Sequence, residues 1–305
     1  MLPVILGFSG ALVFGAADFL GGLASKRLGS MKVTALAALA GFVTLLLASA
    51  WIPGTLDSGA IFWGVLSGIS GSLAIMLLYA SLAIGPMSIL SPLGALVSAV
   101  VPVGWSAIQG HVLGTLGYVA IAIGLVAIVL VGFVPDTKAV RPNARGLLMA
   151  TGAGFFIGLF LIFIAQVNPG TGLIPLLANR ATSFSLMTVA IGVMAGARLA
   201  RRARWVRSAQ RASAAPETSP SNMRSTNLRT GLLLAICCGV VDAVGNTLIL
   251  FGIHIGNLSV MSVLTAMYPI GTIILAGVVL KERITPLQVV GLALAIGAAA
   301  LLALS

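Results

Sequence analysis

Charged residues are scarce in this sequence, and their scarcity excludes a soluble fold. Only 8% of its 305 residues are Asp, Glu, Lys or Arg, whereas 59% are hydrophobic. Soluble domains carry roughly a quarter charged residues, so lipid must cover most of this apolar surface. The apolar runs are continuous over about 20 residues and do not alternate, which is typical of spanning helices and not of a barrel. The sequence therefore predicts an all-α integral membrane protein.

The groups that enzymes use for chemistry are also few. The histidines, His111 and His254, stand alone, and the cysteines, Cys237 and Cys238, are adjacent in one apolar run. The sequence has no metal-ligand spacing, no Ser-His-Asp set and no nucleotide-binding loop. We therefore expect no catalytic residues, no metal, no cofactor and no enzymatic activity. An integral membrane enzyme acting on a lipid or lipid-linked substrate is the alternative interpretation.

Hydropathy divides the chain into two halves of five spans each. A window of about 20 residues finds ten spans at 3–24, 33–52, 61–82, 86–109, 113–133, 146–167, 172–197, 230–250, 256–279 and 286–304. Gly85 and Gly256 predict tight turns between spans. Thr285 and Pro286 predict the N-cap and first helical position of the last span. The expected halves are 1–135 and 136–305.

Lys and Arg follow only the odd-numbered spans one, five, seven and nine, with Arg180 the single exception. This asymmetry predicts cytoplasmic basic loops and external termini in a plasma membrane, the inner membrane of a bacterium. The loop 198–229 carries most of the net charge of +11. We interpret it as a topogenic linker, with contact to anionic lipid as the alternative. No nucleic-acid partner is expected, because no aromatic residues are interleaved with the arginines. A monomer and a homodimer both stay open.

The two halves contain an internal repeat. LLYASLAIGPMSILSPLGA (77–95) aligns without a gap with LILFGIHIGNLSVMSVLTA (248–266), a shift of 171 residues. Gly85 then matches Gly256, and Ser91 matches Ser262. Because five spans is an odd number, the second half must enter the membrane in the opposite orientation. Two inverted five-helix repeats are the usual architecture of an alternating-access transporter.

These features resemble the drug/metabolite transporter superfamily, and most of all its EamA-like ten-helix transporters. The strongest part is LKERITPLQVVG (280–291), which is similar to the family's motif of a Glu-Arg pair, here Glu282 and Arg283, with Thr285 and a later Gly. The first half lacks this motif, because His111 stands where Glu282 aligns. The resemblance implies carrier-mediated movement of a small metabolite or drug-like molecule, often export. Smaller members of the superfamily use a first-helix carboxylate for coupling.

Three ionisable residues lie within spans. Asp18 shares one helical face with small residues of the first span, so it packs on a neighbour or lines a cavity. Asp242 and Asn246 lie on a similar face of the eighth span. Arg180 lies about eight residues into the seventh span, and Asp242 is closer to it in depth than Asp18 is. Arg180 belongs to a structural ion pair or to an anion site, and Asp18 either snorkels toward Lys26 or binds a proton or a cationic group.

Prolines inside spans mark further candidate positions. Pro92, Pro102 and Pro269 interrupt the backbone hydrogen-bond ladder, so the freed carbonyls should face protein, water or substrate. Ser91, Tyr79 and Tyr268 are candidate lining residues near these bends, with ordinary packing as the alternative.

Together the sequence predicts a secondary transporter of a small-molecule substrate, working as an exporter by alternating access, with proton coupling as a hypothesis. A constitutive channel is disfavoured, because no ring of identical polar residues is present. The sequence does not name the substrate.

Overall fold

The computed structural model describes residues 1–84, 87–110, 114–132, 143–209, 225–279 and 285–304, and these residues form helices and no strand. In chain order the helices are α1 (Leu2–Leu28), α2 (Ser30–Ala48), α3 (Ser58–Ile84), α4 (Met87–Ile108), α5 (Thr115–Gly132), α6 (Ala144–Ala165), α7 (Ile174–Ala209), α8 (Ser225–Ile255), α9 (Leu258–Ala266), α10 (Pro269–Val279) and α11 (Pro286–Leu304).

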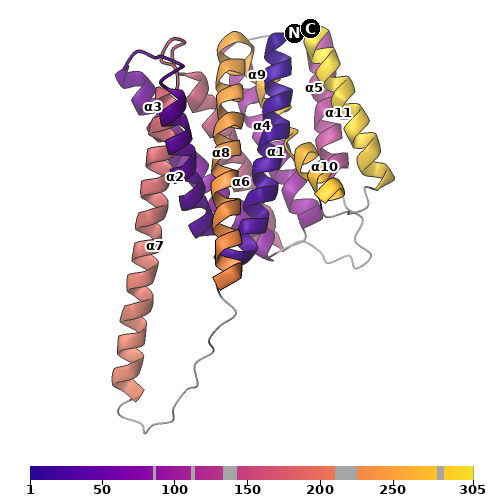
Figure 1. The fold of residues 1–305 in the computed structure, drawn as a ribbon. Coiled ribbons are helices and arrows are strands. Elements are labelled where there is room, and N and C mark those ends of the chain that lie inside the picture. The colour runs from indigo at the N-terminus through magenta and orange to yellow at the C-terminus, as the bar shows by residue number, and fades with distance from the viewer. Residues whose placement is uncertain (85–86, 111–113, 133–142, 210–224, 280–284, 305) are drawn as a thin grey trace.

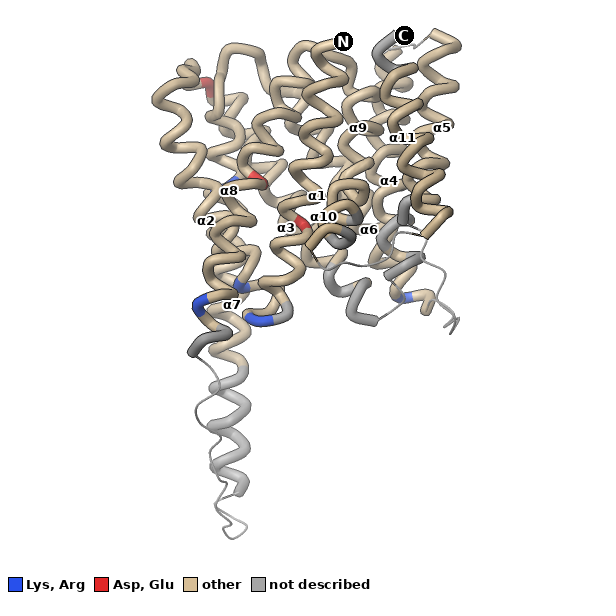
Figure 2. The backbone as a smooth tube through the Cα atoms, turned by 45° about the vertical axis from the view of Figure 1, so that its right-hand side comes forward, with Lys and Arg blue, Asp and Glu red and all other residues tan. Residues whose placement is uncertain are grey.

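The helices lie side by side as one bundle, and both chain termini lie at the same end of it (Figure 1). We call this end the terminal end. Figure 2 shows the described Lys and Arg residues gathered at the opposite end, which we call the basic end, apart from one cation within the bundle. The separation of these two ends in space agrees with the loop assignment made from the charges.

Six helices are long and apolar enough to cross a membrane: α1, α2, α3, α6, α7 and α8. Four shorter apolar segments lie at 93–108, 115–130, 258–272 and 286–301 within the described residues. The structure is therefore that of a multi-pass helical membrane protein. Ten crossings in total remain a prediction, because these four segments are shorter than a standard span of about 20 residues.

The basic connection between the halves is more helical than the sequence predicts. We expect a loop at 198–229, but α7 continues to Ala209 and α8 begins at Ser225. Arg and Ala are strong helix formers and dominate 198–209, and outside the membrane their helix does not need an apolar surface. The loop boundaries are therefore corrected to residues between 210 and 224, which lie outside the described residues.

The ninth predicted span is two helices. It breaks after Ala266, and a new helix starts at Pro269, which has no N–H to donate. Across the break the backbone hydrogen bonds join residues three positions apart instead of four. The N–H of Met267 donates to the carbonyl of Leu264 at 3.1 Å, and the N–H of Tyr268 donates to the carbonyl of Thr265 at 3.0 Å. Pro269 therefore separates two helices rather than bending one.

In contrast, α4 continues through both of its prolines. Neither Pro92 nor Pro102 ends the helix. Pro102 is buried and faces α6, where a Cβ on Gly158 would lie 3.2 Å from its Cδ atom. Pro102 therefore packs against protein, and the exposure of the carbonyls that it frees stays a prediction.

Helices of the two halves pair with one another. α1 packs on α8 and α10, α3 packs on α6 and α7, and α2 lies against α7 and α8. α4 packs on α6 and α9, and α5 packs on α11. Small residues allow the closest approaches, as expected for helices in lipid: a Cβ on Gly15 of α1 would lie 2.6 Å from Cα of Gly271 on α10.

Two predicted helix starts are confirmed by their caps. The Asn257 side chain, directly after Gly256, accepts from the N–H of Ser259 at 2.8 Å. At α11, Thr285 Oγ1 accepts from the N–H of Gln288 at 3.3 Å, while Gln288 Oε1 accepts from the N–H of Thr285 at 2.9 Å, a capping box. Gly85, Glu282 and Arg283 lie outside the described residues.

Candidate functional site

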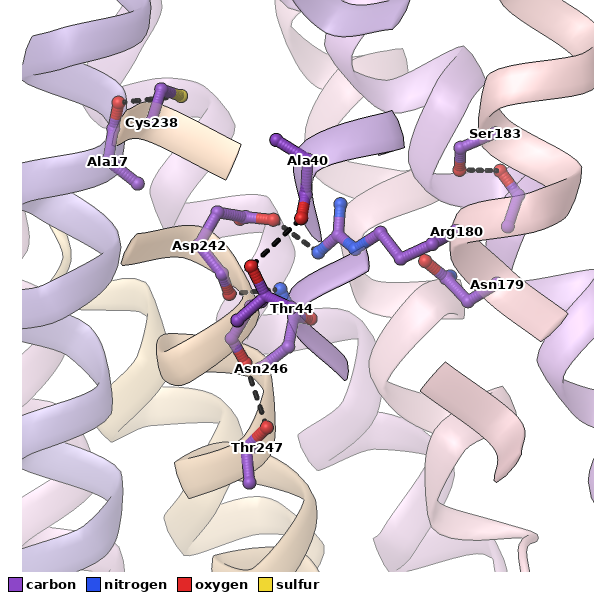
Figure 3. Close-up of polar contacts among 12 residues, drawn as sticks. Ala17, Ala40, Thr44, Asn179, Arg180, Ser183, Cys238, Asp242, Asn246 and Thr247 are labelled. Atoms are coloured by element: carbon purple, nitrogen blue, oxygen red, sulfur yellow. Dashed lines mark hydrogen bonds and ion pairs between the residues drawn. The ribbon is translucent and has the colours of Figure 1, made fainter. Parts of the chain in front are cut away.

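An ion pair lies in the middle of the bundle. The guanidinium of Arg180 on α7 binds the carboxylate of Asp242 on α8 (Figure 3). The side chains are 11% and 23% exposed, respectively, so the pair is largely buried. This is the partner that the depth of the two residues in their helices predicts. A buried charge requires such a partner, because leaving it alone in a low-dielectric interior is costly.

Arg180 reaches Asp242 by crossing α2 at Gly41. A Cβ on Gly41 would lie 3.4 Å from Cδ and 3.5 Å from Nε of Arg180, and 3.1 Å from the carbonyl oxygen of Gly239. A Cβ would therefore be tight against the Gly239 carbonyl oxygen and in ordinary contact with Arg180, so a glycine eases the approach of α8 to α2. The ion pair therefore holds α2 between α7 and α8, and we call this arrangement the Arg180–Asp242 clamp. Arg180 Nε is buried without a hydrogen-bond partner.

Asn246 lies one turn from Asp242 on α8. Its side-chain amide donates to the backbone carbonyl of Asp242 at 2.8 Å, and the residue is 4% exposed. Thr247 donates from its hydroxyl to the carbonyl of Ala243 at 2.8 Å. These bonds satisfy polar groups of α8 locally, so Asn246 fixes the helix beside the clamp.

Asp18 lies where the packing of α1 changes. Toward the terminal end, the same face of α1 is covered: a Cβ on Gly7 would lie 2.9 Å from Leu264 on α9. Toward the basic end, a Cβ on Gly22 would meet nothing within 4 Å. Asp18 is exposed, although its neighbour Ala17 is 3% exposed. Among the described residues, this face of α1 is therefore covered more closely at Gly7 than at Gly22.

The surroundings of Asp18 come from α8 and from the break between α9 and α10. Its charge acts on Asp242 and Cys238 of α8 and on Tyr268 at the break. The hydroxyl oxygen of Tyr268 is buried without a hydrogen-bond partner. Among the side chains that the structure describes, none forms an ion pair with Asp18.

The break itself is fixed against α1. Thr272 of α10 donates from its hydroxyl to the carbonyl of Gly15 at 3.1 Å. On the other side, the Cys238 thiol of α8 donates to the carbonyl of Ala17 at 3.2 Å. These two bonds hold the α1 segment around Asp18 between α8 and α10.

The other candidate lining residues stay predictions. Tyr79 lies on α3, and Ser91 and Pro92 lie on α4, but their side chains are outside the described residues. Sequence reasoning missed Gly41 and Cys238. Gly41 is the single glycine of α2, but the sequence does not place α2 beside Arg180.

Two surface grooves have no charged residue in their lining. One, of about 480 Å³ between α3 and α7, is lined by Ile69, Ala181, Thr182, Ser185, Leu186 and Val189. The second lies between α4 and α5 and is apolar. Within the described residues, no group of three or more His, Cys, Asp or Glu could hold a metal ion.

Comparisons with known proteins agree on the fold. The family model described as "EamA-like transporter family" matches residues 144–304. A solved structure described only as "Crystal structure of protein" has a TM-score of 0.72 and covers 99% of this chain and 98% of its own. It is 15% identical and shows similarity of fold alone. No curated protein sequence matches the chain.

Proposed function

The chain belongs to the EamA-like transporter family, and from this premise we propose that it is a secondary transporter that moves a small metabolite or drug-like solute by alternating access. We place it in the plasma membrane, as an exporter driven by a solute or proton gradient. Its site is the space beside Asp18, with the Arg180–Asp242 clamp as a neighbouring structural element.

The single observation that carries this proposal is the way in which the two halves pair. Exchange α1 with α6, α2 with α7, α3 with α8, α4 with α9 and α10, and α5 with α11. The pair α1–α8 then becomes α6–α3, α2–α8 becomes α7–α3, and α1–α10 becomes α6–α4, all of which are observed. The pairs α2–α7 and α5–α11 map onto themselves. Such exchange symmetry supports two inverted repeats, which supply two related states of one carrier.

Two glycines support the same relation at residue level. Gly68 and Gly239 are 171 residues apart, the shift of the sequence repeat. A Cβ on Gly68 of α3 would lie 2.6 Å from the carbonyl oxygen of Asn179 on α7. A Cβ on Gly239 of α8 would overlap the carbonyl group of Ala37 on α2. Each glycine lets the equivalent neighbouring helix approach closely.

The uneven packing around Asp18 supports a state open toward the basic end. α9 covers α1 on the terminal side of Asp18, whereas no described atom lies within 4 Å of a Cβ on Gly22. In an alternating-access cycle the closed side opens when the open side closes. Asp18 is then the group that meets solute from each side in turn, and a proton can compete for its carboxylate.

Solute counterflow tests the proposal. Purified protein in liposomes is loaded in parallel with single metabolites and drug-like compounds, and entry of the labelled form of each is followed. We expect saturable, gradient-driven exchange of at least one unmodified solute. Chemical conversion of the solute would instead favour a membrane enzyme, and flux that does not saturate would indicate a channel. A screen without exchange of any solute contradicts the proposal.

A further inference from the structure

We infer that the groove between α3 and α7 is a lipid site, which holds an acyl chain of an anionic phospholipid whose phosphate lies at the basic end, within reach of Lys32. The inference goes beyond the proposed function, because it concerns the outer face of the bundle and holds whatever solute is moved.

The first step is that the groove faces the lipid. α3 and α7 are both long and apolar enough to cross a membrane, and they lie together along one side of the bundle (Figure 1). The lining side chains of Ile69, Leu186 and Val189 are 40%, 37% and 62% exposed. The volume of about 480 Å³ falls within the range of about 300–1,000 Å³ that is typical of small-molecule sites. In a bilayer, hydrocarbon chains therefore meet this groove.

The second step relates the groove to the equivalent place in the other half. Gly68 of α3 approaches the backbone of Asn179 on α7. Its equivalent, Gly239 of α8, approaches the backbone of Ala37 on α2 in the same way. These two contacts relate α2 to α7 by a shift of 142 residues, from position 37 to position 179. The groove between α3 and α7 therefore corresponds to the outer face between α8 and α2.

α7 has smaller side chains than α2 at the equivalent places on this outer face. The shift pairs three residues of α7, one turn apart, with three larger residues of α2: Ala181 with Leu39, Ser185 with Val43, and Val189 with Leu47. Leu39 and Val43 are 40% and 47% exposed, so they cover the face that α7 leaves hollow. The repeated fold therefore does not require the groove. Protein surfaces in close contact leave few voids, so this hollow has room for a chain from the bilayer.

The third step is a cation at the basic end of the groove. The connections after α2 and before α7 are hydrogen-bonded to each other, so the two helices run antiparallel. Gly41 of α2 lies beside the Arg180 side chain of α7. Nine residues nearer the basic end, Lys32 of α2 is therefore about level with Val189 of α7. Lys32 is exposed and lies two turns from Leu39, on the same outer face. Its long side chain can therefore reach a phosphate above the groove.

The charge also decides which occupant fits. Beyond the groove α7 continues as a helix to Ala209, and its sequence from 198 to 209 contains five arginines. A second copy of the chain on this face would bring its own arginines beside them, and like charges repel each other. An anionic phospholipid instead supplies the opposite charge at the membrane surface. Its acyl chain then runs from the phosphate into the apolar groove.

Native mass spectrometry of the full-length, delipidated protein in detergent tests the inference. The probes are palmitoyl-oleoyl phosphatidylglycerol, phosphatidylcholine with the same chains, and glycerol phosphate, which has the anion without the chains. We expect the first phosphatidylglycerol to bind at least about tenfold more tightly than phosphatidylcholine, because each cation near the surface contributes a factor of about five. Glycerol phosphate should not bind detectably. Equal affinities of the two lipids, or glycerol phosphate binding as tightly as phosphatidylglycerol, overturn the inference.

Filling the groove tests the place of the acyl chain. Ala181→Leu/Ser185→Val gives α7 the residues that α2 has, and it should weaken binding of both lipids by at least about tenfold. Leu39→Ala/Val43→Ser is the matched control on α2 and should leave the affinity for phosphatidylglycerol unchanged. If the filled variant does not fold, Ser185→Val alone takes its place, because Ser185 is exposed. Unaltered lipid binding in the filled variant, or an equal loss in the control, contradicts a chain in this groove.

Removing the cations tests the place of the phosphate. In a variant that combines Lys32→Gln with Arg198→Gln, Arg201→Gln and Arg202→Gln, the preference for phosphatidylglycerol should fall below about twofold. The affinity for phosphatidylcholine should stay the same, because its chain still has the groove. Arg145→Gln removes an exposed cation at the start of α6 and should not change the preference. A preference that survives in the combined variant overturns the inference.

Discussion

The Arg180–Asp242 clamp predicts that substitutions of its two residues, one on α7 and one on α8, change the free energy of unfolding non-additively. The perturbation is a cycle of Arg180→Gln, Asp242→Asn and the double variant. Each single change leaves one charge, with side chains only 11% and 23% exposed, facing a neutral amide. Removing one partner of a buried pair costs about 3–5 kcal/mol. Because Asp242 is partly exposed, we expect the lower limit, about 3 kcal/mol of unfolding free energy for each.

The double variant should lose much less unfolding free energy than the two single variants lose together. Gln and Asn are both neutral, so no unpaired charge is left, although Gln is shorter than Arg and the direct contact is lost. We expect the unfolding free energy of the double variant to fall by about 1–2 kcal/mol, the usual net contribution of one hydrogen bond. The coupling free energy is then about 4 kcal/mol, far above the deviation of about 0.5 kcal/mol that independent sites show.

The assay is reversible unfolding in mixed micelles at increasing mole fraction of a denaturing detergent, followed by circular dichroism. Asp57→Asn serves as the control, because it removes a carboxylate from the loop before α3. It should change the midpoint of the unfolding transition little. Additive losses from the two single variants would refute the clamp. Equal stability of all four proteins would show that the pair contributes nothing to the fold.

Three further predictions follow from the packing and the charges. A fluorescent protein fused after Ser305 should not mature in intact bacterial cells, because the distribution of Lys and Arg predicts external termini; bright fusions would contradict the topology. Gly41→Ala should lower the unfolding free energy by about 1–3 kcal/mol, because its Cβ would lie 3.1 Å from the Gly239 carbonyl oxygen. Gly22→Ala, with no described atom within 4 Å of its Cβ, should be neutral or slightly stabilising. A larger loss of stability in Gly22→Ala than in Gly41→Ala would refute this packing. Flux of a solute bound at Asp18 should fall as pH is lowered, because protonation removes the charge that binds it, and Asp18→Asn should lose this response; an unchanged pH profile in that variant contradicts the role.

Features set by the order of residues along one helix were predictable. Thr285 caps α11 where the sequence places it, and the turn predicted at Gly256 precedes α9, because turns and caps depend on neighbours within three positions. The partner of Arg180 was predictable as well, since depth follows from counting residues along each helix. The small face of α1 was recognised by its spacing, and the structure packs Gly15 of this face against α10.

Features that depend on which helices are neighbours were not predictable. Nothing in the sequence says that α2 lies beneath Arg180, so the need for glycine at position 41 becomes clear only in three dimensions. The break at Tyr268 likewise depends on α1, whose Gly15 carbonyl binds Thr272 beyond it. A proline alone does not decide such a break, because α4 continues through Pro92 and Pro102.

Alternating access at Asp18 is the central claim, and side-specific labelling tests it most directly. Asp18→Cys is placed in a background with Cys237 and Cys238 replaced by Ala, and a membrane-impermeant thiol reagent is added to either side of sealed, oriented vesicles. Leu56→Cys and Arg27→Cys report sidedness at the terminal and basic ends. We predict that the thiol at position 18 reacts from both sides, each reaction preventing the other. Reaction from the basic end alone, however long the exposure, would describe a fixed crevice and contradict the account.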